Sequence, residues 1–329
     1  MLKWNAMALC AISITLLGCT GKTGHKSNEK YYLISANIKL PYWQSAASGL
    51  YKAAKELDVT AEATGPDTYD PQAEQTAFQK AVAKNPAGLL VSAADPNLMK
   101  ADIDAAIAKG IPVITVDSDT PDSKRLVFIG TNNRQAGVMS ARRTVKELNG
   151  RGNVVIYSIP GQANLDERLA GAKDVFAESP GVKIVESVDM KGDPRVAFDR
   201  TSDIVDKGKL KPDAFVCLEA ISCKEVADVL DRKKITGKTI VAMDTDQGTI
   251  DWIKKGMIAA TIGQKPYTMA YYGLKMLGDL ALNKPSPLDR NWSQDAQSPL
   301  PVFVDTGATL IDKSNVDAFI SARDSSNTR

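Results

Sequence analysis

Short apolar runs alternate with longer amphipathic segments along most of this chain of 329 residues. The runs are rich in β-branched residues and are bounded by Gly or Pro, which is typical of buried strands. We expect strands at residues 31–37, 59–63, 87–92, 111–116, 153–158, 183–188, 214–218, 239–243 and 258–262, and helices at 42–57, 70–84, 96–109, 132–149, 165–178, 194–207, 222–233 and 248–255. This alternation predicts an α/β fold with parallel sheets.

The strand and helix pattern runs through the chain twice. It begins at Tyr31 and starts again with the helix expected at Asn132. The chain is longer than one small core supports, so we expect two doubly wound lobes of similar size. Residues 285–301 contain four prolines and are expected to run over the surface. Because ligands of open parallel sheets bind beyond the carboxyl ends of the strands, the predicted site is a cleft between the lobes.

The first nineteen residues have the pattern of a secretory signal. Lys3 precedes an apolar run at residues 6–17, and Leu16-Leu17-Gly18-Cys19 then resembles the bacterial lipobox. The run is shorter than the roughly 20 residues that span a bilayer. We expect a lipoprotein signal peptide at residues 1–18, a lipid on Cys19 and a flexible tether at residues 19–30. The protein would then be exported, periplasmic or on the cell surface, and anchored to the membrane; an ordinary signal peptide with an incidental cysteine is the alternative.

Composition excludes several classes of function. His25 is the only histidine, which excludes the Ser-His-Asp and Cys-His arrangements of many enzymes. The 41 basic and 39 acidic residues nearly balance and form no basic block, so nucleic-acid binding is not expected. Cys217 and Cys223 are too few for a metal site; they either pair or remain two buried thiols, and the sequence leaves this open. No catalytic residue, metal or cofactor is expected, although paired carboxylates keep glycoside chemistry open.

Polar and aromatic side chains follow the expected strands at the point where each apolar run ends. A charge at the end of a buried strand is costly unless it is hydrogen-bonded, so this convergence indicates recognition of a polar ligand. The candidate ligand-binding residues are Tyr42, Trp43, Asp117, Asn164, Arg168, Glu219, Asp244 and Gln264. Aromatic rings pack on the apolar face of a sugar, while carboxylate, guanidinium and amide groups bind its hydroxyls. We expect the sugar ring to lie between Tyr42 and Trp43 of one lobe, on one side, and polar groups from both lobes, on the other.

Each of these candidates also has a purely structural alternative. The two aromatic residues would serve as a hydrophobic staple at the start of a helix, and the two aspartates would cap the turn or helix that follows them. Arg168 would pair with Asp166 or Glu167 on the surface. Glu219 would interact with the dipole of the next helix. The sequence alone leaves these alternatives open.

Several motifs resemble those of ribose-type periplasmic sugar-binding proteins, the type I solute-binding components of ATP-driven importers. The motifs are Leu40-Pro41-Tyr42-Trp43, residues 112–119, residues 129–133, Asn164 with Arg168 and Gly171, residues 241–244 and residues 260–266. The resemblance covers residues 31–320. It implies that the two aromatic residues, Asp117, Arg168, Asp244 and Gln264 face the ligand, and that Glu219 lines the cleft. It also implies a monosaccharide or polyol as ligand and the permease of an ABC transporter as partner, and no enzymatic activity.

The chain departs from the ribose-type pattern at three positions. Leu40 stands where ribose binders usually have Asn, Ser118 where they usually have Arg, and Glu219 where they have a smaller amide. The cleft thereby loses two hydroxyl-binding groups and gains a carboxylate, which puts ribose itself in doubt. A hexose, a deoxyhexose, another pentose or a polyol fits as well, and a cyclic signalling diol is an alternative ligand.

The resemblance further implies three hinge crossings between the lobes. The hinge residues would be Thr131, Asn132, Ile262, Gly263 and Asp305. The N-terminal lobe would then comprise residues 31–131 and 264–303, and the C-terminal lobe residues 132–263 and 304–322. Closure about the crossings would trap the ligand and present a closed surface to the transporter. We expect a monomer, and a ligand-binding partner of a membrane sensor or chemoreceptor is the alternative function.

Overall fold

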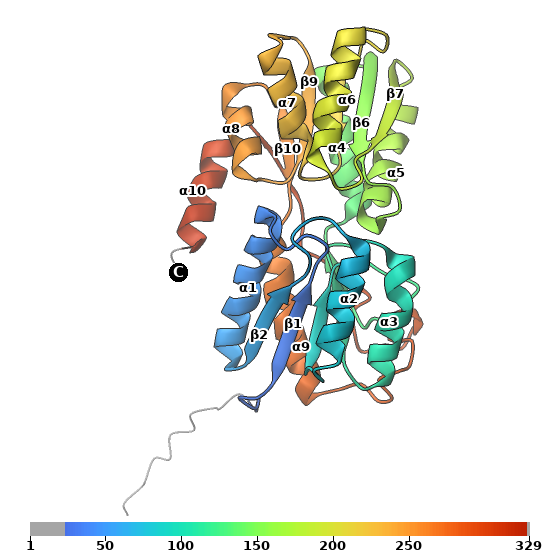
Figure 1. Ribbon diagram of the computed structural model, residues 1–329, viewed down its shortest axis with the longest axis vertical. Coiled ribbons are helices and arrows are strands. Elements are labelled where there is room, and N and C mark those ends of the chain that lie inside the picture. Colours follow the sequence, from blue (N-terminus) through green and yellow to red (C-terminus); the bar gives the residue numbers. More distant parts are fainter. Residues whose placement is uncertain (1–23, 328–329) are drawn as a thin grey trace, which may run out of the picture.

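The computed structural model describes residues 24–327, whose strands form two separate six-stranded sheets (Figure 1). Each sheet is the centre of one α/β lobe, and the two lobes lie one above the other along the long axis of the molecule. The expected fold of two doubly wound lobes is confirmed. The predicted signal peptide and Cys19 lie outside the described residues.

The first lobe is built on a fully parallel sheet with the strand order β11-β5-β4-β3-β1-β2. Its strands are β1 (Lys30–Ile34), β2 (Thr60–Thr64), β3 (Gly88–Val91), β4 (Val113–Val116), β5 (Phe128–Gly130) and β11 (Phe303–Asp305). Its helices are α1 (Pro41–Leu57), α2 (Pro71–Val82), α3 (Pro96–Ala108) and α9 (Pro266–Leu282). Each of these helices starts with a proline, whose fixed φ and missing N–H suit the first helical turn.

The second lobe has the strand order β12-β10-β9-β8-β6-β7. Its strands are β6 (Gly152–Ser158), β7 (Val182–Asp189), β8 (Ala214–Cys217), β9 (Thr239–Met243), β10 (Ala260–Gly263) and β12 (Thr309–Asp312). Its helices are α4 (Asn133–Glu147), α5 (Ala163–Ala177), α6 (Pro194–Lys207), α7 (Ser222–Arg232), α8 (Gln247–Lys255) and α10 (Val316–Asn327). The edge strand β12 departs from the expected parallel pattern, because it pairs antiparallel with β10.

The chain passes between the two sheets three times. The passages lie between β5 and α4, between β10 and α9, and between β11 and β12. Thr131 and Asn132 lie in the first passage, and Asp305 ends β11 at the third. An Asp305 Oδ1 accepts a hydrogen bond of 3.1 Å from the backbone N–H of Asn132, so these two passages are joined directly. The hinge function of these residues stays a prediction.

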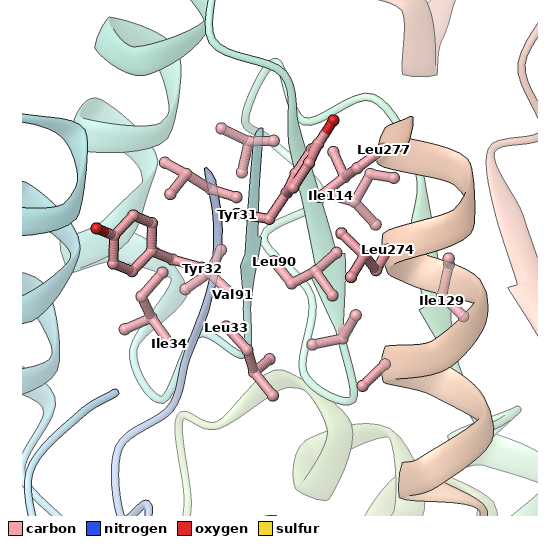
Figure 2. Close-up of a cluster of buried hydrophobic side chains, with 14 of the residues drawn as sticks. Tyr31, Tyr32, Leu33, Ile34, Leu90, Val91, Ile114, Ile129, Leu274 and Leu277 are labelled. Carbon is pink, nitrogen blue, oxygen red and sulfur yellow. The ribbon is translucent and has the colours of Figure 1, made fainter. Parts of the chain in front are cut away.

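The core of the first lobe lies between its sheet and the covering helices (Figure 2). The strands β1, β3 and β4 are buried on both faces and are therefore apolar at nearly every position, as expected for the centre of a parallel sheet. Leu274 and Leu277 of α9 face the strand residues Leu90 and Ile114 (Figure 2). The second lobe has a separate core of the same kind around β6, β8 and β9.

Helices α1 and α9 pack against each other although they are far apart in the chain. A Cβ added at Gly49 would lie 2.1 Å from the carbonyl oxygen of Tyr267, so only glycine allows this close approach of the two backbones. Nearby, the Tyr271 hydroxyl donates a hydrogen bond of 2.6 Å to Glu56, 215 residues away in the sequence. The first lobe is thus completed by helix α9, which comes later in the sequence than every strand of the second sheet except β12.

The segment before β1 differs from the flexible tether expected at residues 19–30. His25 has a side chain only 4% exposed and lies 2.9 Å from a Glu29 carboxylate oxygen, and Lys30 already belongs to β1. The Glu29 carbonyl also accepts from the backbone N–H of Thr60 at the start of β2. The described part of this segment therefore packs on the first lobe. None of the helices in residues 24–327 is both long and apolar enough to cross a membrane.

Candidate functional site

A cavity of about 80 Å³ lies between the two lobes, at the carboxyl ends of the strands. This is several times the space of about 10–15 Å³ that one buried water needs. The lining includes all of the predicted ligand-binding residues, namely Tyr42, Trp43, Asp117, Asn164, Arg168, Glu219, Asp244 and Gln264. The fold therefore brings these side chains together from both lobes, and their contact with a ligand stays a prediction.

Asp117 is the polar centre of the first lobe's side of the cleft. It follows β4 with φ +63°, a left-handed conformation that Asp adopts more readily than most residues. Its Oδ1 accepts a hydrogen bond of 2.6 Å from the Tyr42 hydroxyl, and its Oδ2 accepts from Ser92 at 3.3 Å. Its backbone N–H donates to Ile129 of the neighbouring β5, which fixes the turn that directs this carboxyl away from the sheet.

Asp244 occupies the equivalent place in the second lobe. It follows β9 with φ +65°, and its backbone N–H donates to Ile262 of the neighbouring β10. Its Oδ1 accepts a hydrogen bond of 2.9 Å from the side-chain amide of Gln264. The two lobes therefore repeat one arrangement, in which an aspartate in the left-handed region follows a buried strand and points into the cleft.

A second aspartate, two residues further on, anchors each of these two turns. Asp119 forms a two-pronged ion pair with Arg125, with Oδ–N distances of 2.8 and 2.6 Å. Asp246 caps α8 by accepting from Thr249 Oγ1 at 2.7 Å and from backbone N–H groups of the first turn. Asp246, and not Asp244, is thus the helix cap, and the carboxyl of Asp244 is left for the cleft.

Arg168 is the largest of the fully buried side chains, and it connects three parts of the second lobe's side of the cleft. Its guanidinium donates to Asn133 Oδ1 at 2.9 Å, to the Leu218 carbonyl at 2.8 Å and to Gln264 Oε1 at 2.8 Å. It does not form the surface ion pair with a neighbouring acidic residue that was the structural alternative. Its role in the structure is to fix the amide of Gln264, and through it Asp244.

Glu219 lies in the loop between β8 and α7 and is 7% exposed. Its carboxylate accepts from the Ile221 backbone N–H at 2.6 Å and from the Ser222 hydroxyl at the start of α7. The helix-start alternative for this residue therefore holds alongside its place in the cavity lining. Cys217 and Cys223, whose state the sequence left open, form a disulfide across this loop, with their Cα atoms 5.7 Å apart.

The two aromatic residues of α1 lie together in the lining of the cavity. Tyr42 and Trp43 contact each other edge to face, with ring centroids 5.1 Å apart and planes at 79°. The pair forms an apolar corner of the cavity, and Tyr69 adds a third aromatic side chain to the lining. The position of a sugar ring against this corner stays a prediction.

The two lobes contact each other across the cleft. The Asn164 side-chain amide of α5 donates a hydrogen bond of 3.1 Å to Asp117 Oδ2 of the first lobe. Leu40 packs against the cores of both lobes, and Tyr69 of the first lobe also packs against the second core. The ring of Tyr69 lies against Gly192, where the second lobe has only a hydrogen in place of a side chain. The structure is therefore a closed arrangement of the lobes.

Burial raises the pKa of all three carboxyl groups that line the cleft. Loss of solvent raises the pKa of Asp244 to about 7, an effect that Arg168 and Gln264 oppose and the charge of Asp117 reinforces. Burial likewise raises the pKa of Asp117 and the pKa of Glu219. The charged residues of the lining are these three carboxyl groups and Arg168. The charged forms of these carboxyl groups are therefore costlier here than in water, unless a ligand or bound water solvates their charge.

Several residues at the site were not predicted from the sequence, and three of them make notable contributions. Ser92 ends the β3 region and binds Asp117, Asn133 begins α4 and accepts from Arg168, and Tyr69 lines the cavity just before α2. Ser92 and Tyr69 each lie just beyond the carboxyl end of a strand, the rule that found the other residues. Asn133 adjoins Asn132, whose side chain caps α4, so its sequence signal is that of a helix start.

Comparison with known proteins gives the same family from sequence and from structure. Residues 31–285 match the family model of the periplasmic binding protein domain. The chain is 24% identical over 289 residues to the D-allose-binding periplasmic protein of Escherichia coli (strain K12), covering 84% of this chain and 92% of that one.

Two solved structures are also similar. The sugar-binding protein of a sugar ABC transporter from Bacillus halodurans is 33% identical, with a TM-score of 0.78 and coverage of 88% of this chain and 100% of that one. An arabinose binding protein from Geobacillus stearothermophilus is 30% identical, with a TM-score of 0.74 and coverage of 89% and 99%. The resemblance seen in the sequence motifs is confirmed, and the chain belongs to the periplasmic binding protein family.

Proposed function

We propose that the protein binds one small monosaccharide in the cleft between its lobes and delivers it to an ABC-type importer. The observation that carries the proposal is the matched pair of buried carboxyl groups, Asp117 and Asp244, that the two lobes direct into one cavity. A carboxylate accepts hydrogen bonds from neighbouring hydroxyls, so a polyhydroxylated ring bridges the pair. The sugar-binding relatives described above support this class of ligand.

The remaining groups of the cleft suit the same ligand. Asn164 Oδ1 is buried and has no hydrogen-bond partner within the described part of the chain, so it is free to accept from a sugar hydroxyl. The corner formed by Tyr42 and Trp43 offers aromatic surface to the C–H groups of a ring. The supporting residues come from both lobes, and a ligand held by both stabilises the closed arrangement over an open one.

The test is a titration of the mature protein with D-allose, D-ribose, D-arabinose, D-glucose, D-galactose and D-tagatose. Binding is followed by calorimetry and by intrinsic tryptophan fluorescence, to which Trp43 in the cleft contributes. For the sugar that binds, Asp244→Ala and Arg168→Ala should each weaken binding by about 2–4 kcal/mol, the cost of losing charged hydrogen bonds and leaving partners unpaired. Asp251→Ala is the control, because that aspartate is exposed on α8 in the same lobe. Unchanged affinity in both site variants contradicts the site assignment.

The protein is proposed to act outside the cytoplasm, as a lipoprotein anchored through Cys19. The support is the sequence Leu16-Leu17-Gly18-Cys19 after an apolar run. Replacement of Cys19 by Ser should abolish incorporation of a radiolabelled fatty acid and move the protein from the membrane to the soluble fraction. Binding is proposed to be the whole chemistry of the cleft, so the bound sugar should be recovered chemically unchanged after prolonged incubation.

A further inference from the structure

The disulfide between Cys217 and Cys223 spans one of the loops that line the cleft. Cys217 is the last residue of β8, Cys223 is the second residue of α7, and both side chains are buried. We infer that this disulfide is a positioning element of the binding site, which holds residues 218–222 (the β8–α7 loop) in the conformation that faces the ligand. The inference rests on the proposed function, because the ligand is the sugar proposed for this cleft.

The β8–α7 loop contributes to the cleft through almost every residue. Glu219, Ala220 and Ile221 line the cavity. The Leu218 carbonyl accepts the hydrogen bond of 2.8 Å from Arg168, so the position of the guanidinium depends on the path of the loop. A shift of this loop therefore moves a cavity wall and one of the three acceptors that hold Arg168 at the same time.

The other two acidic loops of the cleft show what anchors such a segment. The loop after β4 is held by the ion pair of Asp119 with Arg125, and the loop after β9 by the capping bonds of Asp246. In both, the anchor is a second acidic side chain, separate from the aspartate that faces the cavity. The loop after β8 has no second acidic residue, since Ala220 and Ile221 follow Glu219.

Glu219 cannot supply that anchor itself. Its carboxylate bonds only to Ile221 and Ser222 among the hydrogen bonds of the described chain, and both partners belong to the same loop or its helix start. Such bonds shape the loop but do not tie it to the rest of the lobe. The disulfide joins the strand before the loop to the helix after it, and so takes the part that Asp119 and Asp246 play elsewhere in the cleft.

The position of the disulfide in the sequence argues against stabilisation of the whole fold as its main role. Its cysteines are six residues apart in the sequence, and closing so short a loop removes less conformational freedom from the unfolded chain than closing a long loop does. The lobe already has a continuous apolar core around β6, β8 and β9. Loss of the disulfide should therefore change the cleft more than it changes the stability of the fold.

The experiment compares the mature wild-type protein with the double variant Cys217→Ala/Cys223→Ala. The control is Val229→Ala, a buried truncation on the same helix α7 outside the loop, which lowers stability without releasing the loop. Three quantities are measured for each protein: the melting temperature, the hydrogen–deuterium exchange of loop amides without ligand, and the affinity for the sugar that binds best among the six named above. A fourth protein carries the double variant together with Glu219→Gln.

We expect loop amides to exchange about tenfold faster in the double variant than in wild type, and not in Val229→Ala. Sugar affinity should fall about tenfold in the double variant, and much less in Val229→Ala, although both melt at lower temperatures than wild type. In the Glu219→Gln background, removing the disulfide should weaken binding less than it does alone, because the loop acts partly through that carboxylate.

The outcomes separate this inference from the proposed function. Unchanged loop exchange in the double variant overturns the inference, whether or not any sugar binds. Faster loop exchange with unchanged sugar affinity also overturns the inference, because the disulfide would then hold the loop without any effect on sugar binding. If the wild-type protein binds none of the six sugars, the proposed sugar function fails, while the exchange measurement still decides whether the disulfide holds the loop.

Discussion

The contact between Tyr69 and Gly192 allows closure of the lobes to be tested apart from folding. The two residues belong to different lobes and meet only where the lobes touch. A Cβ added at Gly192 would lie 2.4 Å from both Cβ and Cγ of Tyr69. Carbon atoms in ordinary contact are about 3.5–4.0 Å apart, so Gly192→Ala requires the lobes to separate by about 1 Å at this point.

The expected effect on sugar binding follows from that overlap. Overpacking of this kind costs about 1–3 kcal/mol, and the cost applies to the closed arrangement but not to an open one. Because the ligand must bind the closed arrangement, the apparent Kd should rise about 5- to 150-fold. Gly192 also has φ +72°, where alanine is strained by about 1–2 kcal/mol in either arrangement. That strain lowers the melting temperature but does not enter the difference between open and closed.

A matched control removes the effect of backbone strain. Gly237 has φ +73° and nothing within 4 Å of an added Cβ, so Gly237→Ala carries the same strain without a contact. Both variants should melt a few degrees below wild type, at about 2–4 °C per kcal/mol for a domain of this size. Titration calorimetry with the sugar that binds should then show weaker binding for Gly192→Ala alone. Equal affinities of the two variants would refute the reasoning.

Three further predictions concern the polar groups of the cleft. Replacement of Arg168 by Met removes the donor of Asn133 Oδ1 and of the Leu218 carbonyl, and one of the two donors of Gln264 Oε1, and should lower the free energy of unfolding by about 2–4 kcal/mol in urea titrations; a loss below 1 kcal/mol would argue against its bridging role. Arg125→Met breaks the largely buried ion pair with Asp119 and should cost about 3–5 kcal/mol in the same assay, against an exposed-pair control, Arg195→Met, expected below 1 kcal/mol. The folded pKa of Asp244 is raised to about 7, so the folded chain holds a proton between about pH 4 and pH 7 that the unfolded chain releases. The contribution of this group to stability therefore falls as pH rises through that range. Urea midpoints at pH 5 and pH 7.5 should differ less for Asp244→Asn than for wild type, and an identical pH dependence of the two proteins contradicts the assignment.

The fold was predicted from the sequence wherever a strand or helix has its own periodic pattern. Three-residue strands such as β5 (Phe128–Gly130) and β11 (Phe303–Asp305) lack one, and neither was assigned as a strand. β5 pairs with β4 on one side and with β11 on the other, with Phe303 opposite Phe128. The pairing of β11 therefore joins segments about half the chain apart. Helix α9 was missed as well, since it is buried against both α1 and the sheet and shows no clear polar stripe.

The candidate site likewise contains residues that the sequence identifies and residues that only the structure reveals. The charged residues at strand ends were identified because a buried charge needs a reason, and that argument needs no coordinates. Ser92 and Asn133 carry no charge and resemble ordinary loop and helix-start residues, so their bonds to Asp117 and Arg168 emerge only from the structure. The edge-to-face contact of Tyr42 with its neighbour likewise depends on side-chain angles that adjacency in sequence does not determine.

The close packing of α1 against α9 bears on the order in which the lobes mature during synthesis and export. The second lobe draws all but β12 and α10 from one continuous stretch, so most of its core assembles from neighbours in the sequence. The first lobe needs α9 and β11 to cover its sheet, and these emerge only after that stretch is complete. Contacts between such distant segments form slowly. The sheet of the first lobe, although made first, therefore stays incomplete until α9 and β11 follow, and its apolar strands remain exposed while most of the second lobe's core assembles.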